Sequence, residues 1–357
     1  MKDNPKVAII VPIYNVENYL SHCLDSLLKQ TYSNLVFVLI NDGSSDKSVE
    51  IAKSYCLNNS CFILIDKKIN EGLSKTRNTG LEFLEKKFSF QKIRENQYKI
   101  LENPHFEVFS FTPPPQLIDE TIEYIEFLDS DDYLESDCIE VSIRYAQQYQ
   151  LDLVCAGINH ITNEYKKISS DFGLLHEVKK NKILKGIEII RENKYNFFYG
   201  SWNILINFKF LKSINLRFIN GIIYEDHYFG IMLFMKARRI IVLNYFFYYY
   251  VNTMNSITRP KEITQSRVLL NFQSWKMTIE KLEQDVQDIN YKKIIKKYIK
   301  NFYFPMMCKS YLELDSSFQQ KIRNEIKKYE KYRSLKTSLM LNFPKIYSYL
   351  KKIKRYI

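Results

Sequence analysis

The chain has 357 residues, enough for one domain of about 250 residues and a smaller appended region. Its net charge of +12 lies in the C-terminal part, because residues 291–357 hold 18 Lys and Arg against 4 Asp and Glu, so the preceding residues are close to neutral. This distribution excludes broad nucleic-acid binding and favours a tail attracted to anionic lipid or another polyanion. The six scattered cysteines form no Cys-x-x-Cys pair, and the charged start of the chain is no signal peptide, so we expect a cytoplasmic protein.

The first third of the chain alternates buried strands with helices. The apolar, β-branched run over residues 6–13 is typical of a buried parallel strand, and apolar residues at three-to-four spacing predict a helix over 16–30. The same patterns predict strands at 35–40 and 62–65, a helix capped by Ser44 or Ser45, and a helix at 72–87. This order predicts a doubly wound parallel sheet, in which ligands bind at the carboxyl ends of the strands.

Residues 88–121 interrupt this alternation, because they are mixed in charge, lack a clear period and contain three successive prolines. A strand over 124–128 then resumes the sheet and ends at Asp129, and a helix at 137–150 and a strand at 153–159 follow. Irregular structure is expected up to Ile223, and helices from about Val268 onward. We therefore expect a domain of residues 1–260, with an insertion at 88–121, and a helical, basic region of residues 261–357.

Three carboxylates in four positions, Asp129, Asp131 and Asp132, follow the strand at 124–128 directly. Like charges this close repel one another unless a cation lies between them, and Mg²⁺ and Mn²⁺ prefer oxygen ligands. An acidic loop that caps the next helix is the alternative, and for an isolated motif it is the more frequent case.

Four segments occur in order, each at the end of a predicted strand: IIVPIYNVENYL, NDGSSDKS, NEGLSKTRNTGL and FLDSDDYL. Together they resemble the nucleotide-diphospho-sugar glycosyltransferases of family 2, of the type that builds bacterial surface polysaccharide and lipopolysaccharide. The resemblance covers residues 6–87 and 122 to about 258, and the interruption at 88–121 is not part of the family's usual pattern. It implies a GT-A fold, a Rossmann-like, mostly parallel α/β sheet flanked by helices.

The resemblance also implies roles for individual residues. Those that would contact the nucleotide are Pro12, Tyr14, Asn15, Asp42, Arg77 and Asp129. Asp131, with Asp129, would hold Mn²⁺ or Mg²⁺ on the two phosphates, while Asp132 would either assist or cap a helix. Asn41 stands where the family often has a further Asp, so Asp42 alone is assigned to the base.

Residues 218–229 (FINGIIYEDHYF) resemble the acceptor side of such a site. An inverting transfer needs a base that deprotonates the attacking hydroxyl, and the resemblance implies Asp226 for this role, with Glu225 as the competing choice. The same pair could instead stabilise the start of a helix through its dipole. His227 is read as structural.

The function implied is an inverting, metal-dependent transfer of a hexose, with galactose or a related sugar favoured, from a UDP-sugar. The acceptor would be a glycan or lipid-linked oligosaccharide in lipopolysaccharide, lipooligosaccharide or capsule biosynthesis. A sugar-nucleotide nucleotidyltransferase is an alternative, but it would need a Gly-rich basic loop after the first strand. A non-catalytic nucleotide-sugar-binding protein is another, although Asp129, Asp131 and Asp226 are all present.

The tail has two readings. Residues 291–300 (YKKIIKKYIK) alternate paired lysines with apolar residues, and 345–357 repeat the mixture. Such a helix could lie on an anionic membrane, which would make the protein peripheral on the inner face of the cytoplasmic membrane. Its apolar side could equally pack on the protein while the lysines are solvated.

Overall fold

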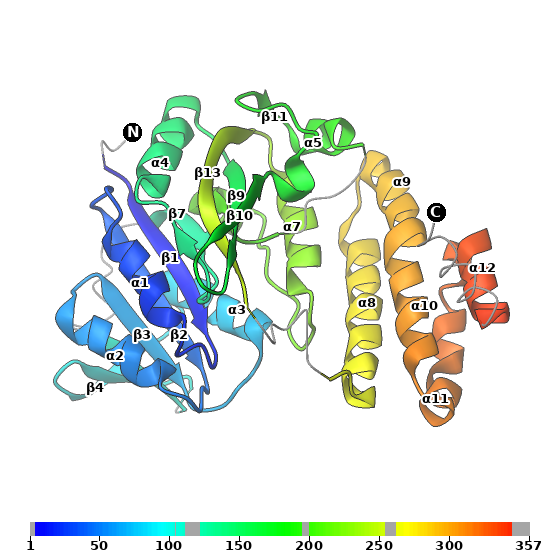
Figure 1. The fold of residues 1–357 in the computed structure, drawn as a ribbon, viewed down its shortest axis with the longest axis horizontal. Coiled ribbons are helices and arrows are strands. Elements are labelled where there is room, and N and C mark those ends of the chain that lie inside the picture. The colour runs from blue at the N-terminus through cyan, green and yellow to red at the C-terminus, as the bar shows by residue number, and fades with distance from the viewer. Residues whose placement is uncertain (1–3, 104, 111–121, 195–199, 254–261, 345–357) are drawn as a thin grey trace. The chain divides into compact units, whose positions relative to one another are not determined.

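The computed structural model describes residues 4–103, 105–110, 122–194, 200–253 and 262–344 (Figure 1). The chain divides into two compact units. The first comprises Met1–Asn220 and Phe229–Met254, and the second comprises Gly221–Tyr228 and Asn255–Ile357. Helix α7 (Glu225–Lys236) therefore starts in the second unit and continues in the first.

Four parallel strands form the centre of the sheet in the first unit. Their order is β7-β1-β2-β3, and they comprise β1 (Lys6–Ile13), β2 (Leu35–Asp42), β3 (Phe62–Lys67) and β7 (Ile122–Phe127). Nearly every residue in them is buried, because helices cover both faces, and this explains why they read as continuous apolar runs. The expected parallel α/β core is confirmed.

Within the described residues, strands on both sides extend this core to a sheet of 13 strands. Next to β3 lie three antiparallel strands from the expected insertion at residues 88–121: β6 (Phe106–Ser110), β5 (Gln97–Ile100) and β4 (Phe90–Arg94). On the other side of β7 lie β12 (Ile204–Asn207), β9 (Leu153–Thr162), β13 (Ile240–Asn252) and β11 (Ile183–Leu184). Off this path, β8 (Tyr133–Leu134) pairs with β13, and β10 (Lys167–Asp171) pairs with β9.

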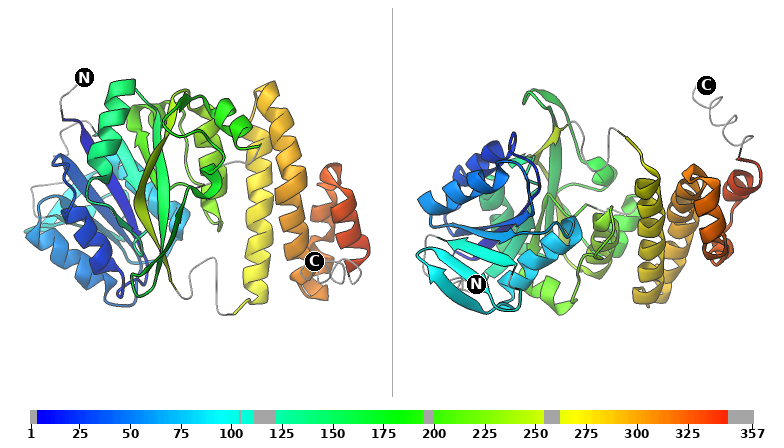
Figure 2. Two further views of the ribbon diagram at one scale, coloured as in Figure 1. Left: turned by 45° about the horizontal axis from the view of Figure 1, so that its top comes forward. Right: turned by 90° about the horizontal axis from the view of Figure 1, so that it is seen from below.

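Helices pack on the two faces of the parallel strands (Figure 2). Helix α1 (Leu20–Leu28) packs on the face that carries Val7, Ile9 and Val11. Helix α3 (Leu73–Leu84) packs on the opposite face, where a Cβ at Gly80 would lie 2.7 Å from Ile10 Cγ2 and 2.8 Å from Ile40 Cδ1. A glycine there lets α3 approach the sheet. The described part of this unit also contains the helices α2 (Ser48–Asn58), α4 (Cys138–Tyr149), η2 (Gly173–Leu175), α5 (Gly186–Glu192) and α6 (Phe208–Ser213).

The second unit is helical, as expected. Its elements are α8 (Gln265–Asp285), α9 (Ile289–Tyr298), η3 (Ile299–Tyr303), α10 (Phe304–Glu313), α11 (Ser316–Lys327), η4 (Glu330–Tyr332) and α12 (Leu335–Asn342). Helix α10 packs against α8, α11 and α12, and the π-helical η3 joins α9 to α10 without a break. Among the described helices, none combines the length and the apolar character needed to cross a membrane.

Helix α9 bears on whether the apolar side of the basic tail lies on a membrane or packs on the protein. Ile295 and Ile299 are buried inside the second unit, whereas Lys293, Lys296 and Lys300 are exposed. Part of the apolar side of this helix is thus used in packing, while its lysines and Ile289, which is 64% exposed, face solvent. The second basic stretch, residues 345–357, lies outside the described residues.

Candidate active site

The loops that follow β1 and β2 are joined to each other at the carboxyl edge of the sheet. Asn15 adopts a left-handed conformation with φ 51°. Its N–H donates to Ser44 Oγ (3.1 Å), and its side-chain oxygen accepts the N–H of Ser45 (2.8 Å). Pro12 is buried, whereas the side chain of Tyr14 is 49% exposed. Of the three residues expected near the base, Tyr14 and Asn15 are therefore both exposed, and Asn15 also holds the two loops together.

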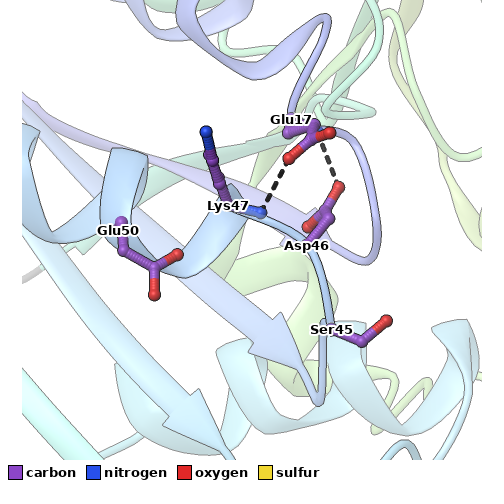
Figure 3. Close-up of a pocket in the computed structure, with 5 residues that line it drawn as sticks. All are labelled: Glu17, Ser45, Asp46, Lys47 and Glu50. Atoms are coloured by element: carbon purple, nitrogen blue, oxygen red, sulfur yellow. Dashed lines mark hydrogen bonds between the residues drawn. The ribbon is translucent and has the colours of Figure 1, made fainter.

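A shallow hollow lies beside these loops, lined by Glu17, Ser45, Asp46, Lys47 and Glu50 (Figure 3). Asp46 accepts the N–H of Glu17 (3.0 Å), and Glu17 accepts the N–H of Lys47 (2.9 Å). Asp46 also accepts the N–H of Ser48, at the first residue of α2. The expected cap at Ser44 or Ser45 is wrong, because those serines are engaged with Asn15. None of Asp42, Arg77 or Asp129–Asp132 lines this hollow.

Asp42 lies in a buried network with Lys67. The Nζ of Lys67 donates to Asp42 Oδ1 (2.5 Å), which also accepts the N–H of Glu71 (3.0 Å). Asp42 Oδ2 accepts the N–H of Gly72 at the start of α3 (2.9 Å). Lys67 is fully buried and also pairs with Glu71. Asp42 thus closes the β2 edge onto α3, and a cation inside the protein balances its charge.

Asn41 stands at the position where the family often has an Asp, and it has a structural role. Its amide nitrogen donates to Asp66 (2.8 Å), and its amide oxygen accepts the N–H of Ser44 (3.1 Å). An Asp could not donate the first of these bonds. The following Gly43 has φ +71°, and a Cβ there would lie 2.7 Å from the backbone nitrogen of Asn70, so glycine is required by both conformation and space.

Arg77 and Asp129 are brought together from α3 and the end of β7. Arg77 Nη2 donates to Asp129 Oδ1 at 2.6 Å. The guanidinium is almost fully buried and lies 5.3 Å from the centroid of the Phe218 ring, whereas the side chain of Asp129 is 27% exposed. Asp129 therefore presents part of its carboxylate outward while a fixed arginine lies behind it.

Asp131 lies partly exposed beside this pair. One of its oxygens accepts the hydroxyl of Thr253, just after β13, at 3.1 Å. Burial, and next the charge of Asp129, raises the pKa of Asp131 to about 6. A raised carboxyl pKa means that negative charge is unfavourable there, and a divalent cation would relieve that cost.

Asp132, whose role was left open, is a structural acid. It is buried and accepts the hydroxyl of Tyr248 (2.7 Å) and the N–H of Val251 (2.8 Å), both from β13. Burial, followed by the charges of Asp131 and Asp129, raises the pKa of Asp132 well above its usual range. Tyr248 also accepts the N–H of Asp129 at 3.4 Å. Asp132 therefore caps no helix and fixes the acidic loop to β13.

Glu225 and Asp226 form the first turn of α7, within the second unit. Glu225 is 6% exposed, and Asp226 is more open. Two acidic residues at this position also suit the dipole of the helix. His227 is buried against Tyr303, 3.1 Å from its hydroxyl, and burial lowers its pKa to about 3, so it is a neutral, structural histidine as expected.

The chemistry of the acidic loop fits a divalent metal that a phosphate completes. Within the described parts of the chain, no group of three or more His, Cys, Asp or Glu side chains is arranged to hold a metal alone. Mg²⁺ is typically bound by one or two carboxylates together with substrate phosphates, and Asp129 and Asp131 supply that number. Arg77, Asp129 and Asp131 are thus the predicted residues that lie together, while Tyr248, Thr253 and Lys67 support the site without having been predicted as site residues.

The segment from β1 through α3 carries a family signature. Residues 8–88 match glycosyl transferase family 2. This part of the chain belongs to glycosyl transferase family 2. The family 2 segment supplies Pro12, Tyr14, Asn15, Asp42 and Arg77, and the acidic loop lies beyond it.

Curated relatives extend the similarity over most of the chain. It is 28% identical to Glycosyltransferase GlyA of Streptococcus pneumoniae over 77% of this chain and 34% of GlyA. It is 30% identical to the uncharacterized glycosyltransferase EpsJ of Bacillus subtilis over 71% of this chain and 63% of EpsJ. The chain thus spans less than two thirds of both proteins. A Cholesterol galactosyltransferase of Borreliella burgdorferi is 26% identical over 84% of this chain and 74% of that protein.

Solved structures confirm the GT-A fold. Residues 1–349 of S. aureus TarS, in complex with UDP-GlcNAc, match with a TM-score of 0.60 at 16% identity, over 85% of this chain and 79% of that one. The mannosyltransferase PcManGT from Pyrobaculum calidifontis, in complex with GDP-Man and Mn²⁺, matches with a TM-score of 0.52 at 12% identity, over 99% of this chain and 84% of that one.

Proposed function

We propose that this chain is a metal-dependent, inverting glycosyltransferase that uses a UDP-sugar as donor. The observation that carries the proposal is the Arg77–Asp129 pair beside Asp131 at the carboxyl edge of the parallel strands. Ligands of open α/β sheets bind at this edge, and the three side chains there combine a fixed cation with two carboxylates that face partly outward.

Each of these residues has a part in holding the donor. Asp129 keeps one oxygen on Arg77, so its other oxygen is left to accept the hydrogen bond of a ribose hydroxyl. Arg77 places a permanent positive charge near the phosphates, and burial fixes its planar head. Tyr14 is exposed after β1, where it can lie against the base, with Pro12, Asn15 and Asp42 shaping that end of the site.

Asp131, with Asp129, would hold Mn²⁺ or Mg²⁺ on the donor phosphates. The metal, when bound, would neutralise charge on the departing nucleoside diphosphate. Thr253 donates to one oxygen of Asp131 and so orients the other oxygen for this contact. PcManGT, a structural neighbour, was solved with Mn²⁺, which supports this choice.

Asp226 is the proposed base. Its carboxylate accepts the proton of the acceptor hydroxyl while the hydroxyl oxygen forms a bond to the anomeric carbon of the donor. The bond from that carbon to the phosphate oxygen breaks, and its electron pair leaves with UDP, so the configuration inverts. Asp226 is more exposed than Glu225, which supports Asp226 over its neighbour.

We propose galactose or a related hexose as the transferred sugar. The name of the Borreliella burgdorferi relative, a galactosyltransferase, supports this choice. The acceptor would be a glycan or lipid-linked oligosaccharide of lipopolysaccharide, lipooligosaccharide or capsule, on the inner face of the cytoplasmic membrane. The exposed lysines of α9 would then add attraction to anionic lipid, and no nucleic acid is expected as a partner.

A screen of nucleotide-sugars tests the proposal. The purified chain is titrated calorimetrically with UDP and with UDP-hexoses, with and without Mn²⁺, and hydrolysis of each donor is followed by released UDP. We expect UDP to bind at least tenfold more tightly with Mn²⁺. Asp226→Asn should keep that binding and lose turnover. Metal-independent UDP binding would refute the donor site, and full turnover in Asp226→Asn would refute the base.

A further inference from the structure

Four aromatic rings gather beside the acidic loop, and none of them has a part in the mechanism above. We name His22, Tyr133, Tyr165 and Tyr249 the aromatic wall. The His22 ring lies 4.5 Å from Tyr133 and 4.1 Å from Tyr165, measured between centroids. Tyr133 and Tyr249 are stacked at 4.4 Å, with 7° between their planes. His22 is exposed and the three tyrosines are half-buried, so the wall faces solvent in part.

The wall is assembled from four segments that are distant in sequence. His22 comes from α1, Tyr133 and Tyr249 from the paired strands β8 and β13, and Tyr165 from the turn between β9 and β10. Tyr165 has φ 60°, a left-handed conformation that is rare and costly for a bulky side chain. The turn thus holds a large ring in an unfavourable backbone state, where it covers His22.

The wall borders the proposed donor site. Tyr133 follows Asp132 directly in the chain, and Cys23, next to His22, donates from Sγ to the carbonyl oxygen of Asp129 (3.8 Å). Burial, and then the charges of Tyr19, Cys23 and Asp131, raises the pKa of Tyr165. The wall therefore reaches this loop from the α1 side, while Arg77 reaches it from α3 on the opposite face of the sheet.

We propose that the aromatic wall binds a pyranose ring of the sugar substrates, with Tyr165 as its principal contact. The inference rests on the proposed function, because it gives a sugar-binding role to the surface next to the nucleotide residues. A pyranose has an apolar C–H face and a rim of hydroxyls. Tyrosine offers a rigid apolar face and a hydroxyl at its edge, so the two are complementary. The ring could come from the donor hexose or from the acceptor.

The test separates these two sources with Tyr165→Ala, Tyr165→Phe and His22→Ala. In the donor arm, calorimetry gives the ratio of Kd for UDP to Kd for UDP-galactose, UDP-glucose and UDP-N-acetylglucosamine, with Mn²⁺ present. In the acceptor arm, saturation-transfer NMR follows methyl β-D-galactopyranoside and methyl β-D-glucopyranoside with UDP and Mn²⁺, and again without nucleotide. Tyr165→Ala should weaken one arm about tenfold or more and leave the Kd of UDP unchanged, whereas Tyr165→Phe should stay within about threefold of the wild type.

Tyr149→Ala is the matched control, because its ring pairs with Tyr145 at 6.1 Å on α4, within the same unit. Tyr149→Ala should leave sugar binding in both arms unchanged. His22→Ala changes the wall from α1 and leaves the turn that contains Tyr165 intact, so a loss of sugar binding in this variant cannot come from unfolding of that turn. A loss in the donor arm assigns the wall to the donor sugar, and a loss in the acceptor arm assigns it to the acceptor. Wild-type values in both arms for Tyr165→Ala and His22→Ala would overturn the inference, as would a wild type that binds UDP but no sugar. Absence of UDP binding would overturn the donor site instead, and the arm without nucleotide would still test the wall.

Discussion

The parallel strands β2 and β7, which lie on either side of β1, both end in acidic residues, but the charge of these residues is compensated differently. Asp42, at the end of β2, is 3% exposed and receives the ammonium of Lys67 and two backbone N–H groups. Asp129, Asp131 and Asp132 follow β7 as three carboxylates, and Arg77 is the one cation that contacts them among the residues that the structure describes. The first acid is neutralised inside the protein, and the second group carries surplus negative charge.

This difference predicts that the acidic loop after β7, rather than Asp42, is the segment that an added cation would stabilise. Burial raises the pKa values of Asp131 and Asp132, and each is raised further by neighbouring acids. Asp132 is compensated by Tyr248 and Val251, whereas Asp131 accepts a hydrogen bond from Thr253 and remains partly exposed. An added cation would therefore lower the free energy of the acidic loop far more than that of Asp42.

The largest effect is expected from Asp131→Asn. The amide keeps the size of the side chain and an oxygen for the Thr253 hydroxyl, but it removes the charge that would hold the metal. We expect turnover of the UDP-sugar to fall roughly 1,000-fold, equivalent to about 4 kcal/mol, and the tighter UDP binding with Mn²⁺ to disappear. Steady-state kinetics and calorimetry with and without Mn²⁺ measure both.

Asp42→Asn sharpens this result, because it removes one charge from the compensated segment. It should lower stability and weaken UDP itself, yet keep the ratio of UDP affinities with and without Mn²⁺. Asp25→Asn, at an exposed carboxylate on α1, controls for a general loss of charge. An equal loss of the Mn²⁺ ratio in Asp42→Asn and Asp131→Asn would show that the two segments do not differ in the way described.

The second effect concerns stability and is expected from Lys67→Met. The substitution keeps the length of the buried chain but leaves Asp42 and Glu71 without their shared cation. Breaking a buried ion pair from one side costs about 3–5 kcal/mol, and the backbone donors that remain on Asp42 place the expected loss near the lower limit. Urea unfolding measures it.

Two controls separate the buried charge from other effects of the substitution. Lys67→Met combined with Asp42→Asn should recover about half of the loss or more, because no unpaired charge then remains on Asp42. Lys166→Met breaks the exposed pair with Glu164 and should change stability by less than about 1 kcal/mol. Additive losses in the double variant would contradict a charge network around Asp42.

The sequence predicts the parallel core well and the sheet edges poorly, for physical reasons. The strand expected at 6–13 has those bounds, because a strand buried on both faces is a continuous apolar run. The strand expected at 35–40 runs on to Asp42, since Asn41 and Asp42 still pair with Asp66 and Lys67 although they are polar. The strands at 90–110 had no such signal, because β4 is exposed along most of its length and β6 is fixed by its long-range pairing with β3.

The site residues likewise divide into those that the sequence predicts and those that it does not. The motifs predicted Arg77, Asp129 and Asp131 at one edge of the sheet, and Arg77 does contact Asp129 there, because chain order and parallel topology determine where strand ends lie. The partners of Asp132 are Tyr248 and Val251, 116 and 119 residues away, and nothing local in the sequence links them. The fully buried Lys67 resembles any lysine in sequence, and only its pairing with Asp42 shows its part in the site.

The smallest expected effect is a pH dependence of stability that arises from Glu126 on β7, three residues before Asp129. This buried acid differs from both Asp42 and the acidic loop. Glu126 is 2% exposed, and burial alone raises its pKa to about 8. The ordinary value of about 4.5 applies to the unfolded chain, so the neutral acid favours the folded state, and this stabilisation is complete below about pH 4.5. It is lost as the pH rises, and the loss is complete only above about pH 8. Between pH 5 and 8 the wild type should lose roughly 3 kcal/mol through this group.

Glu126→Gln removes this titration and keeps the shape of the side chain, so the difference in unfolding free energy between variant and wild type should grow from pH 5 to pH 8. Urea unfolding at several pH values measures that difference, and carboxyls elsewhere cancel because both proteins contain them. Glu85→Gln is a control whose difference from the wild type should stay constant from pH 5 to pH 8, since hydrogen bonds and charge from Lys87 and Arg217 outweigh burial there and lower its pKa. A difference that stays constant across this range would mean that Glu126 is ionised in the folded protein, and β7 would then contain a buried charge that no cation among the described residues pairs with, unlike Asp42 and Asp129.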